Sequence, residues 1–476
     1  MRCTVLLFGK PVLLPVNPGR NFRAGYNSYR ALWSEIVTDV AKKETALHAN
    51  PRPSSERLPE FGFAGLSYVH RLDRIGQGLY GTFAQIDEKR LPAKGQSVSA
   101  GQKRLLVINC GQLLTLKGPR GPRRGAEMRE LGLIRKGALL IKGERIEQVG
   151  PQDQIFRSPL ARAARQVDAG GKVVLPGFVD SHTHALFTAS RVDEYEARIR
   201  GATYSQIASA GGGIQASAKQ IRHAGERGLV RRLLDALRLF VEYGTTTVEI
   251  KSGYGLDPSQ ELKMLRAIRG AAQASPLDLV PTLLIHDVAA RYRSRRTAYL
   301  RAVIDRLIPQ VRRARLAECF DVFCDRGYFS IAETRALLTA AAQAGFRLKI
   351  HAEQLARSGA ARMASDLCAL SADHLDHLRD ADMPRLRRHG TIATLLPGSV
   401  LHLASGPFPP ARRLLEAGVP VALASNYNPG SSPTVNMQMI LSLACSQMPA
   451  AKCITSVDRG CGHRLCRRHA HLRTGE

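Results

Sequence analysis

The sequence predicts an α/β protein built on a closed parallel (β/α)8 TIM barrel. Short apolar runs recur from Val173 onward, and most are followed by a segment with helical periodicity. Nearly every run ends in a polar or charged cluster, as strands do at the carboxyl end of such barrels. Buried strands that alternate with helices form parallel sheets, and eight of them close into a barrel. The runs span residues 173–184, 245–255, 277–287, 320–325, 347–354, 367–374, 391–399 and 420–428.

The segments outside the barrel differ in character. Residues 1–104 are rich in Pro, Gly and Asn, which is typical of a loop-rich extension, and its role is unknown. Residues 105–172 contain short strand-like runs, and Gly143 marks a tight hairpin between two of them. We therefore expect a small, incomplete β-sandwich at 105–172, the barrel at 173–448, and a basic tail with Cys and His at 449–476.

One helix between the first two barrel strands is visible from its periodicity. Leu229, Leu233, Leu237 and Val241 recur every four residues, and charged residues lie off that stripe. The pattern predicts a helix that buries one face against the sheet.

Composition narrows the class of protein. The 476 residues carry a net charge of +29, but the basic residues are scattered and accompany no nucleic-acid motif, which favours a solvated surface over a nucleic-acid partner. A positive field would also attract a small anionic substrate. The nine cysteines show no disulfide-like rhythm, and Lys10 and Pro11 interrupt the only signal-like run, so we expect a cytoplasmic protein. No apolar run reaches the roughly 18 residues of a membrane span, so no membrane partner is expected.

The end of the first barrel run carries the first chemical signal. His182 and His184 lie two residues apart, and on a strand such residues point to the same side. Two neutral imidazoles make half of a metal site, although two histidines in a polar loop would give the same pattern. Three further strand ends carry His286, His351 and His374. Because these ends form one ring in a parallel barrel, the sequence favours a metal site there.

Several motifs resemble one family. The segment 175–184, LPGFVDSHTH, is similar to the first-strand motif of the amidohydrolase superfamily. Five further segments, taken in order, resemble the imidazolonepropionase family over about Leu105 to Met448. These segments are 182–214, 245–257, 349–355, 371–375 and 426–433. The resemblance implies metal-dependent hydrolysis of the cyclic amide of 4-imidazolone-5-propanoate to N-formimino-L-glutamate, a step of histidine degradation.

The resemblance also implies roles for single residues. One Zn2+ or Fe ion per chain would be held by His182, His184 and His351, with Asn426 at the fourth position. The implied substrate-binding residues are Arg191, Tyr254, His286, Gln354, Asn428, Gly430 and Ser431. The implied catalytic residues are His374, Gln354 and Asn426. A guanidinium suits a propanoate carboxylate because it binds carboxylates in a bidentate manner.

Each of these residues has a plainer interpretation. Arg191 could pair with Asp193 or Glu194 on a surface loop. Tyr254 could cap a turn, and the glycines at 211–213 could form a flexible loop without ligand. These alternatives stay open from sequence alone.

The sequence departs from the family at two places. Asn426 stands where the family has an aspartate, and an amide oxygen is a neutral, weaker ligand that does not take a proton from water. After Met448 no apolar strand is visible, so we expect unpaired edges beside the strand near Leu105. The tail's Cys453, Cys461, His463, Cys466, His469 and His471 fit no standard zinc spacing.

Other functions remain possible beside the family activity. The chain could be another cyclic-amide hydrolase or deaminase of the superfamily, or a catalytically impaired member because of Asn426. A basic nucleic-acid binder is the third alternative. The resemblance also suggests a homodimer.

Overall fold

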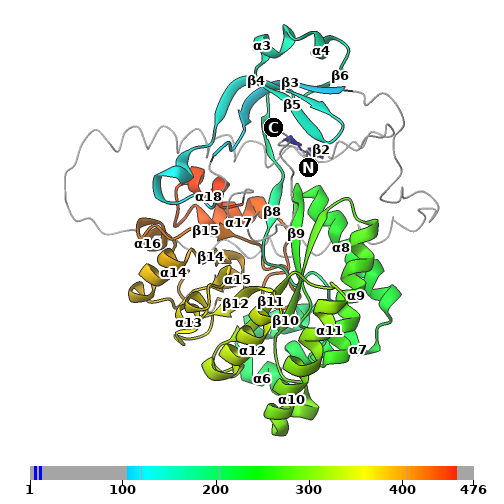
Figure 1. Cartoon of the computed structure of the whole chain (residues 1–476), viewed down its shortest axis with the longest axis vertical. Coiled ribbons are helices and arrows are strands. Elements are labelled where there is room, and N and C mark those ends of the chain that lie inside the picture. Colours follow the sequence, from blue (N-terminus) through cyan, green and yellow to red (C-terminus); the bar gives the residue numbers. More distant parts are fainter. Residues whose placement is uncertain are drawn as a thin grey trace. The chain divides into compact units, whose positions relative to one another are not determined.

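A computed structural model describes residues 5–7, 10–12, 104–118, 121–202, 204–404 and 406–457. Its main feature is an eight-stranded parallel sheet wrapped by helices (Figure 1). Within the described ranges no helix has both the length and the apolar character needed to cross a membrane.

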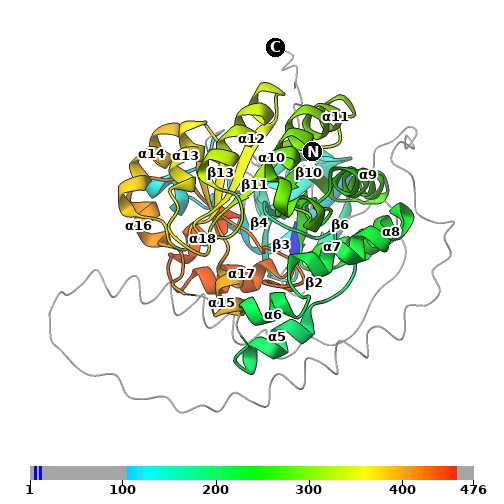
Figure 2. The ribbon, with the colours of Figure 1, turned by 90° about the horizontal axis from the view of Figure 1, so that it is seen from below.

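The barrel strands follow the chain in order around the sheet. Each strand pairs in parallel with the next, and all eight predicted runs contribute one strand, which confirms the predicted fold class. Figure 2 shows the helices arranged around these strands. The strands are β8 (Phe178–Asp180), β9 (Thr245–Lys251), β10 (Asp278–Ile285), β11 (Cys319–Cys324), β12 (Arg347–Ala352), β13 (Ser371–His374), β14 (Ile392–Leu395) and β15 (Val421–Leu423).

The seam between β8 and β15 closes just beyond the strand ends. The Asn426 N–H donates to the His182 carbonyl (3.1 Å), and the His184 N–H donates to the Tyr427 carbonyl (2.9 Å). Beside these bonds, the Ser425 N–H donates to Asp180 Oδ1 (3.0 Å). The backbone that closes the barrel is therefore the backbone that carries three of the predicted metal ligands, His182, His184 and Asn426.

Alternate residues of the strands face opposite sides. Val248, Ile250, Phe320 and Val322 join the large apolar core between strands and helices. At the amino ends of the strands, a second, smaller apolar cluster is formed by Val179, Val280, Cys319, Ile392 and Ala422. Two residues further along four of these strands, the same face carries the buried polar residues Ser181, Thr282, Asp321 and Thr394.

Helices cover the outside of the barrel and connect its strands. In α8, Leu229, Leu233 and Leu237 are buried as predicted, but Phe240 rather than Val241 completes the stripe, because the helical period is 3.6 residues. The helical segments are η1 (Gly125–Arg129), α3 (Gln152–Phe156), α4 (Pro159–Arg162), α5 (Val192–Ile199), α6 (Tyr204–Ser209), α7 (Ile214–His223), α8 (Glu226–Glu242), α9 (Pro258–Ala274), η2 (Ala290–Arg295), α10 (Arg296–Ala302), η3 (Val303–Leu307), α11 (Ile308–Arg313), α12 (Ile331–Gln343), α13 (Ala360–Asp366), η4 (Asp380–Asp382), α14 (Met383–His389), α15 (Pro397–Leu403), α16 (Ala411–Glu416), α17 (Met437–Ala444) and α18 (Ala450–Ser456).

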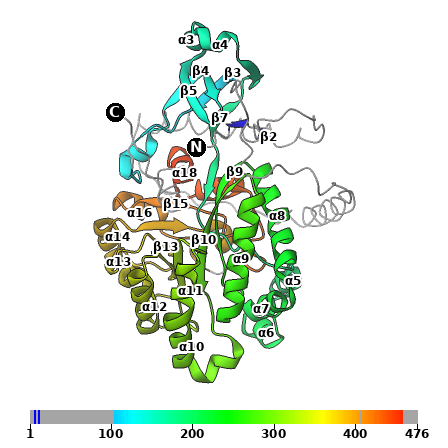
Figure 3. The same ribbon diagram turned by 45° about the vertical axis from the view of Figure 1, so that its right-hand side comes forward.

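A second sheet precedes the barrel. Its strands are β1 (Val5–Leu7), β2 (Lys10–Val12), β3 (Arg104–Leu114), β4 (Leu133–Lys142), β5 (Arg145–Pro151), β6 (Arg165–Asp168) and β7 (Val173–Pro176). Gly143 lies in the tight turn between β4 and β5, as predicted. Figure 3 shows α3 and α4 beside these strands.

The expectation of unpaired edges beside the strand near Leu105 is wrong. On one side β3 pairs with β4, and on the other it pairs in parallel with β6 and β7. The outer edge of β7 is in turn paired with β1 from the amino-terminal end of the chain. Strands from before the barrel therefore occupy the positions beside β3 and β7 that we expected to be unpaired.

The structure also refines the expected segment borders. The apolar run at 173–184 is divided, because β7 belongs to the small sheet and only β8 enters the barrel. At the other end, α18 extends past residue 448, and the Val457 carbonyl accepts from Val179 N–H of β8 (3.0 Å). Cys453 is buried in α18, whereas Cys461, His463, Cys466, His469 and His471 lie outside the described residues, as does most of the 1–104 extension.

Candidate active site

Three imidazole rings converge at the carboxyl ends of β8 and β12. His182, His184 and His351 are all buried, and one nitrogen of each lies within 4.8 Å of the other two. Nε2 of His351 is 3.3 Å from Nε2 of His184. Two nitrogens bound to one tetrahedral ion at about 2.05 Å lie about 3.3 Å apart. The spacing of this histidine triad therefore fits a single metal ion.

Two carboxylates determine which nitrogen of His182 and of His351 faces the position that a metal ion would take. Nδ1 of His182 is 2.6 Å from Asp373 Oδ2, and Nδ1 of His351 is 3.1 Å from Asp321 Oδ1. A carboxylate accepts from an Nδ1–H, so each Nε2 is left with its lone pair. In the described part of the chain, the buried Nε2 of His182 has no hydrogen-bond partner. A buried nitrogen without a partner is costly, and a metal ion would satisfy it.

Burial also keeps the rings neutral, as metal ligands must be. Desolvation, together with neighbouring positive groups, lowers the pKa of His182, His184 and His351 well below its ordinary value. Desolvation likewise lowers the pKa of His286 to about 3 and that of His374 to about 4. These five imidazoles are therefore unprotonated near pH 7.

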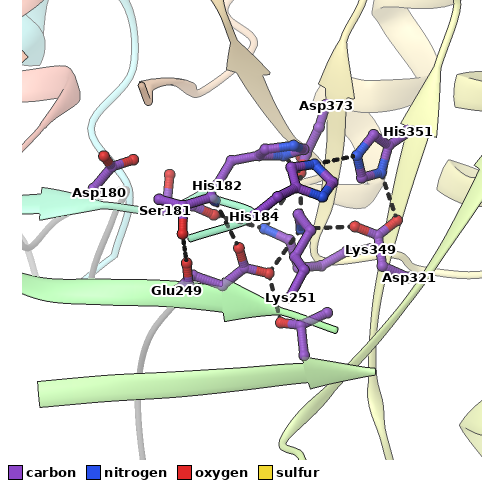
Figure 4. Close-up of polar contacts among 12 residues, drawn as sticks. Asp180, Ser181, His182, His184, Glu249, Lys251, Asp321, Lys349, His351 and Asp373 are labelled. Carbon is purple, nitrogen blue, oxygen red and sulfur yellow. Dashed lines mark hydrogen bonds and ion pairs between the residues drawn. The ribbon is translucent and has the colours of Figure 1, made fainter. Parts of the chain in front are cut away.

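A cluster of five charged side chains lies next to the histidine triad (Figure 4). This buried charge cluster consists of Glu249, Lys251, Asp321, Lys349 and Asp373. Nζ of Lys251 lies 2.7 Å from both Glu249 Oε1 and Asp321 Oδ2, and 3.9 Å from Asp373 Oδ2. Nζ of Lys349 lies 3.4 Å from the same Asp373 oxygen. All five side chains are fully excluded from solvent.

Lys251 is the cation at the centre of this cluster. Burial by itself would lower the pKa of its ammonium group, but the carboxylates of Asp321, Glu249 and Asp373 outweigh burial and the pKa is raised. Lys251 is therefore charged throughout the neutral range.

The charge cluster was not predicted from the sequence, although a signal was present. Glu249 and Lys251 are two residues apart on one strand, as are Lys349 and His351 on another. On strands that are otherwise apolar, charged residues at this spacing face the barrel interior together with the ligands.

Three strand ends carry unusual backbone angles. Glu353, His374 and Asn426 have φ values of +55°, +79° and +53°. Non-glycine residues rarely adopt this left-handed conformation, and such residues cluster at functional sites. The turns after β12, β13 and β15 are therefore held in conformations that redirect side chains around the triad.

Further aromatic and imidazole rings lie beside the triad. The His286 ring stacks on His184 with centroids 5.2 Å apart, and Tyr254 lies 5.6 Å from His286. The His374 ring lies 5.5 Å from His182 and 5.4 Å from His351. The structure thus brings Tyr254, His286, His351 and His374, all singled out from the sequence, close to His182 and His184.

The loop after β15 is organised by its own side chains. Asn428 Oδ1 accepts from the N–H groups of Gly430 (2.8 Å) and Ser431 (2.7 Å), and its Nδ2 donates to Ser431 Oγ (2.7 Å). Nδ2 of Asn426 also donates to Ser431 Oγ, over 3.4 Å. The buried Oδ1 of Asn426 has no hydrogen-bond partner among the described residues, so it is available to a ligand.

Arg191 forms the pair with Glu194 that its sequence position left open, and its role toward a substrate stays a prediction. Its Nε and Nη2 donate to the two oxygens of Glu194 over 2.9 and 2.6 Å. Its guanidinium also lies directly against Gly430, because a Cβ at that glycine would be 2.5 Å from Nη1. Glu194 additionally accepts from the Gly213 N–H (2.8 Å), so the glycine loop at 211–213 is tied to Arg191.

Gln354 lies in a turn that is held through backbone hydrogen bonds. It is partly buried and lies just beyond the carboxyl end of β12. Its backbone N–H donates to Asp325 Oδ2 (2.8 Å), as does that of Leu355. Asp325 therefore fixes the turn that carries Gln354 after β12.

Comparison with known proteins agrees with this geometry. Residues 165–231 match the model described as "Amidohydrolase family". Solved structures with a similar fold include an adenosine deaminase from Xanthomonas campestris (18% identity, TM-score 0.50, 76% of this chain and 80% of that chain). A guanine deaminase from C. acetobutylicum is similar at 11% identity and a TM-score of 0.52, over 76% of this chain and 87% of that chain. At such identities these structures show the fold alone.

The barrel and a buried histidine triad that can bind a metal define a hydrolase of the amidohydrolase class. Much closer relatives are named imidazolonepropionase. They include those of Symbiobacterium thermophilum, 44% identical over 72% of this chain and 81% of the relative, and Solibacter usitatus, 44% identical over 76% and 87%. The relative from Geobacillus kaustophilus is 40% identical over 77% and 87%. The chain belongs to the imidazolonepropionase family.

Proposed function

We propose that this protein hydrolyses the cyclic amide of 4-imidazolone-5-propanoate to N-formimino-L-glutamate in histidine degradation. The observation that carries the proposal is the buried histidine triad at the mouth of the barrel, in a chain 44% identical to relatives named imidazolonepropionase. In the reaction, the ring carbonyl carbon gains the oxygen of water and its bond to the ring nitrogen breaks. The nitrogen takes up a proton.

The metal ligands of the proposal are His182, His184 and His351, with Asn426 as a neutral fourth ligand. Their donor set supports one Zn2+ or Fe ion, because imidazole suits both metals. Such an ion polarises a carbonyl and lowers the pKa of water to near 7. The unpartnered Oδ1 of Asn426 supports its place in the set.

The chain's own residues would bind and orient the substrate. Arg191 binds the propanoate carboxylate, and its position against Gly430 supports this role. The N–H groups of Gly430 and Ser431 are fixed by Asn428, so the loop is rigid before substrate arrives. Tyr254 and His286 contact the imidazolone ring, and their rings' positions beside His184 support this role.

Proton transfer is assigned to groups near the triad. His374 is neutral near pH 7, so its imidazole can accept a proton from the attacking water. Gln354 binds the imidazolone ring through its amide. We further propose a cytoplasmic enzyme that forms a homodimer, in which residues 105–172 form an accessory β domain.

A second candidate is a catalytically impaired member of the family. Asn426 favours it, because an amide cannot accept a proton as an aspartate does. Hydrolysis or deamination of another cyclic amide by the same site is the remaining alternative.

Turnover of 4-imidazolone-5-propanoate by the purified, metal-loaded protein tests the proposal, followed by ultraviolet absorbance. An Asn426→Asp variant is run beside it, because it restores the carboxylate. Turnover by the unaltered chain that is lost with a chelator and regained with Zn2+ supports the proposal. Turnover by the variant alone identifies an impaired enzyme. If both proteins are folded, loaded and inactive, the substrate assignment is wrong.

A further inference from the structure

We infer that Asp373 and Asp321 are positioning residues that set the affinity of the histidine triad for its metal ion, and that Lys251 couples the two carboxylates. The inference rests on the proposed function only in its premise that the triad binds a metal.

Each carboxylate contacts one ligand and one cation. Asp321 accepts from His351 Nδ1 through Oδ1 (3.1 Å) and from Lys251 Nζ through Oδ2 (2.7 Å). Asp373 meets His182 Nδ1 at 2.6 Å through Oδ2, and the ammonium groups of Lys349 and Lys251 approach the same oxygen. Lys251 therefore links Asp321 and Asp373. These two carboxylates contact ligand histidines from different parts of the barrel.

This arrangement does more than pack the barrel interior. An imidazole with its Nδ1–H donated to a carboxylate has a fixed tautomer and a fixed ring plane, and its Nε2 is a stronger donor to a metal. A charge pair that served only structure would not need to end on two ligand nitrogens. The orphaned Nε2 of His182 and the 3.3 Å approach of His351 Nε2 to His184 Nε2 are both on the side opposite these carboxylates.

Because Asn426 is neutral, the negative charge of the buried cluster, which reaches the metal through the ligand imidazoles, becomes more important. Three formal carboxylates in the cluster face two formal ammonium groups, so the cluster is negative by one charge. With an amide at 426, the triad has no carboxylate among its proposed ligands. The anionic field at the metal then comes from the buried charge cluster through His182 and His351.

Glu249 provides a matched control in the same cluster. Its carboxylate contacts Lys251 (2.7 Å), Thr282 Oγ1 and the Thr183 N–H, but no imidazole in the described part of the chain. Glu249→Gln removes one buried negative charge just as Asp373→Asn and Asp321→Asn do. The three variants therefore separate the effect of charge from the effect of ring positioning.

The experiment measures Zn2+ affinity by competition with a chromophoric chelator, on the full chain and the three variants. Circular dichroism and thermal melting of the metal-free proteins check that each is folded. We expect Asp373→Asn and Asp321→Asn to weaken Zn2+ binding about 10- to 100-fold, and Glu249→Gln to weaken it less than about threefold. The visible spectrum of the Co2+-loaded protein should change in the first two variants and not in the third.

A measurement on the unaltered chain guards against variants that fail to fold. After labelling with 15N-histidine, nitrogen shifts in the metal-free protein report the tautomer, and we expect Nδ1–H forms for His182 and His351. Equal losses in all three variants, unchanged Zn2+ affinity in Asp373→Asn, or Nε2–H tautomers would overturn the inference. Absence of Zn2+ binding by the unaltered chain would also overturn it, whereas Zn2+ binding without turnover removes only the proposed function.

Discussion

Gly430 provides a demanding test of the site, because its missing side chain is what lets Arg191 lie against the loop after β15. A Cβ on Gly430 would lie 2.5 Å from Arg191 Nη1 and 2.6 Å from Cζ. Ordinary carbon–nitrogen contacts begin near 3.4 Å, so Gly430→Ala requires a separation of about 0.9 Å between loop and guanidinium.

Neither the Arg191 guanidinium nor the loop after β15 can move freely. The guanidinium is held by two short bonds to Glu194, whose side chain is itself mostly buried. The loop is held by the Asn428 side chain, which accepts from two successive N–H groups. A displacement of about 1 Å in a group that positions substrate reduces rate by roughly 100-fold. We therefore expect kcat/KM for 4-imidazolone-5-propanoate to fall about 10- to 100-fold, mainly through KM.

Steady-state kinetics on Gly430→Ala and on a Gly228→Ala control measure this effect. Gly228 lies in α8, and a Cβ at this position would meet no atom within 4 Å. Its substitution should therefore leave the kinetics unchanged and stabilise the helix by about 1 kcal/mol. An unchanged kcat/KM in Gly430→Ala, or an equal loss in the control, would refute the assigned contact between Arg191 and the loop.

Three further predictions concern stability and thiol chemistry. Lys251→Met should lower the free energy of unfolding by about 3–5 kcal/mol in urea titrations, because it leaves buried carboxylates without their cation; a loss under about 1 kcal/mol would contradict this. The Arg296 guanidinium and the Ser330 cap lower the pKa of Glu333 to about 2 from its ordinary 4.5, so its contribution is present above pH 4.5 and is lost as the pH falls toward 2. Since this carboxylate is partly exposed, Glu333→Gln should cost about 1 kcal/mol at pH 7 and less at pH 3, and a deficit that grows on acidification would refute the pairing. The thiols of Cys445 and Cys453 lie 3.7 Å apart, so diamide should oxidise them to a disulfide that non-reducing peptide mapping detects and Cys453→Ser abolishes; a bond from Cys445 to another cysteine would disprove the pairing.

The barrel could be predicted from sequence because its signals are local. Each barrel strand has three to eight residues and lies within one of the largely apolar runs, and α8 shows its buried stripe in the spacing of Leu229, Leu233 and Leu237. The division of the run at 173–184 could not be read in the same way. Both halves of this run are apolar. Only the pairing of Val173–Pro176 with β1 and β3 shows that the first half belongs to the small sheet.

The site was predictable where residue type alone carries chemistry. Histidines at strand ends indicated a metal, but the roles of Asp321 and Asp373 depend on which strands are neighbours. Asp373 precedes His374 in sequence, yet the imidazole that it contacts is that of His182, just after β8. Such a contact follows from barrel closure and from the left-handed turn at His374, neither of which has a signature in the linear sequence.

The seam of the barrel has a consequence for the order in which the protein is assembled. His182 and His184 follow the first barrel strand, β8, whereas the backbone that pairs with them follows the last, β15. During synthesis these backbone pairs cannot form until Asn426 and Tyr427 have been added to the chain. A metal ion bound across β8 and β12 would protect this seam from opening, because ligand binding stabilises only the closed form. Metal binding should therefore slow amide hydrogen exchange at His184 and at Asn426 together. Exchange in the outer helices should slow less.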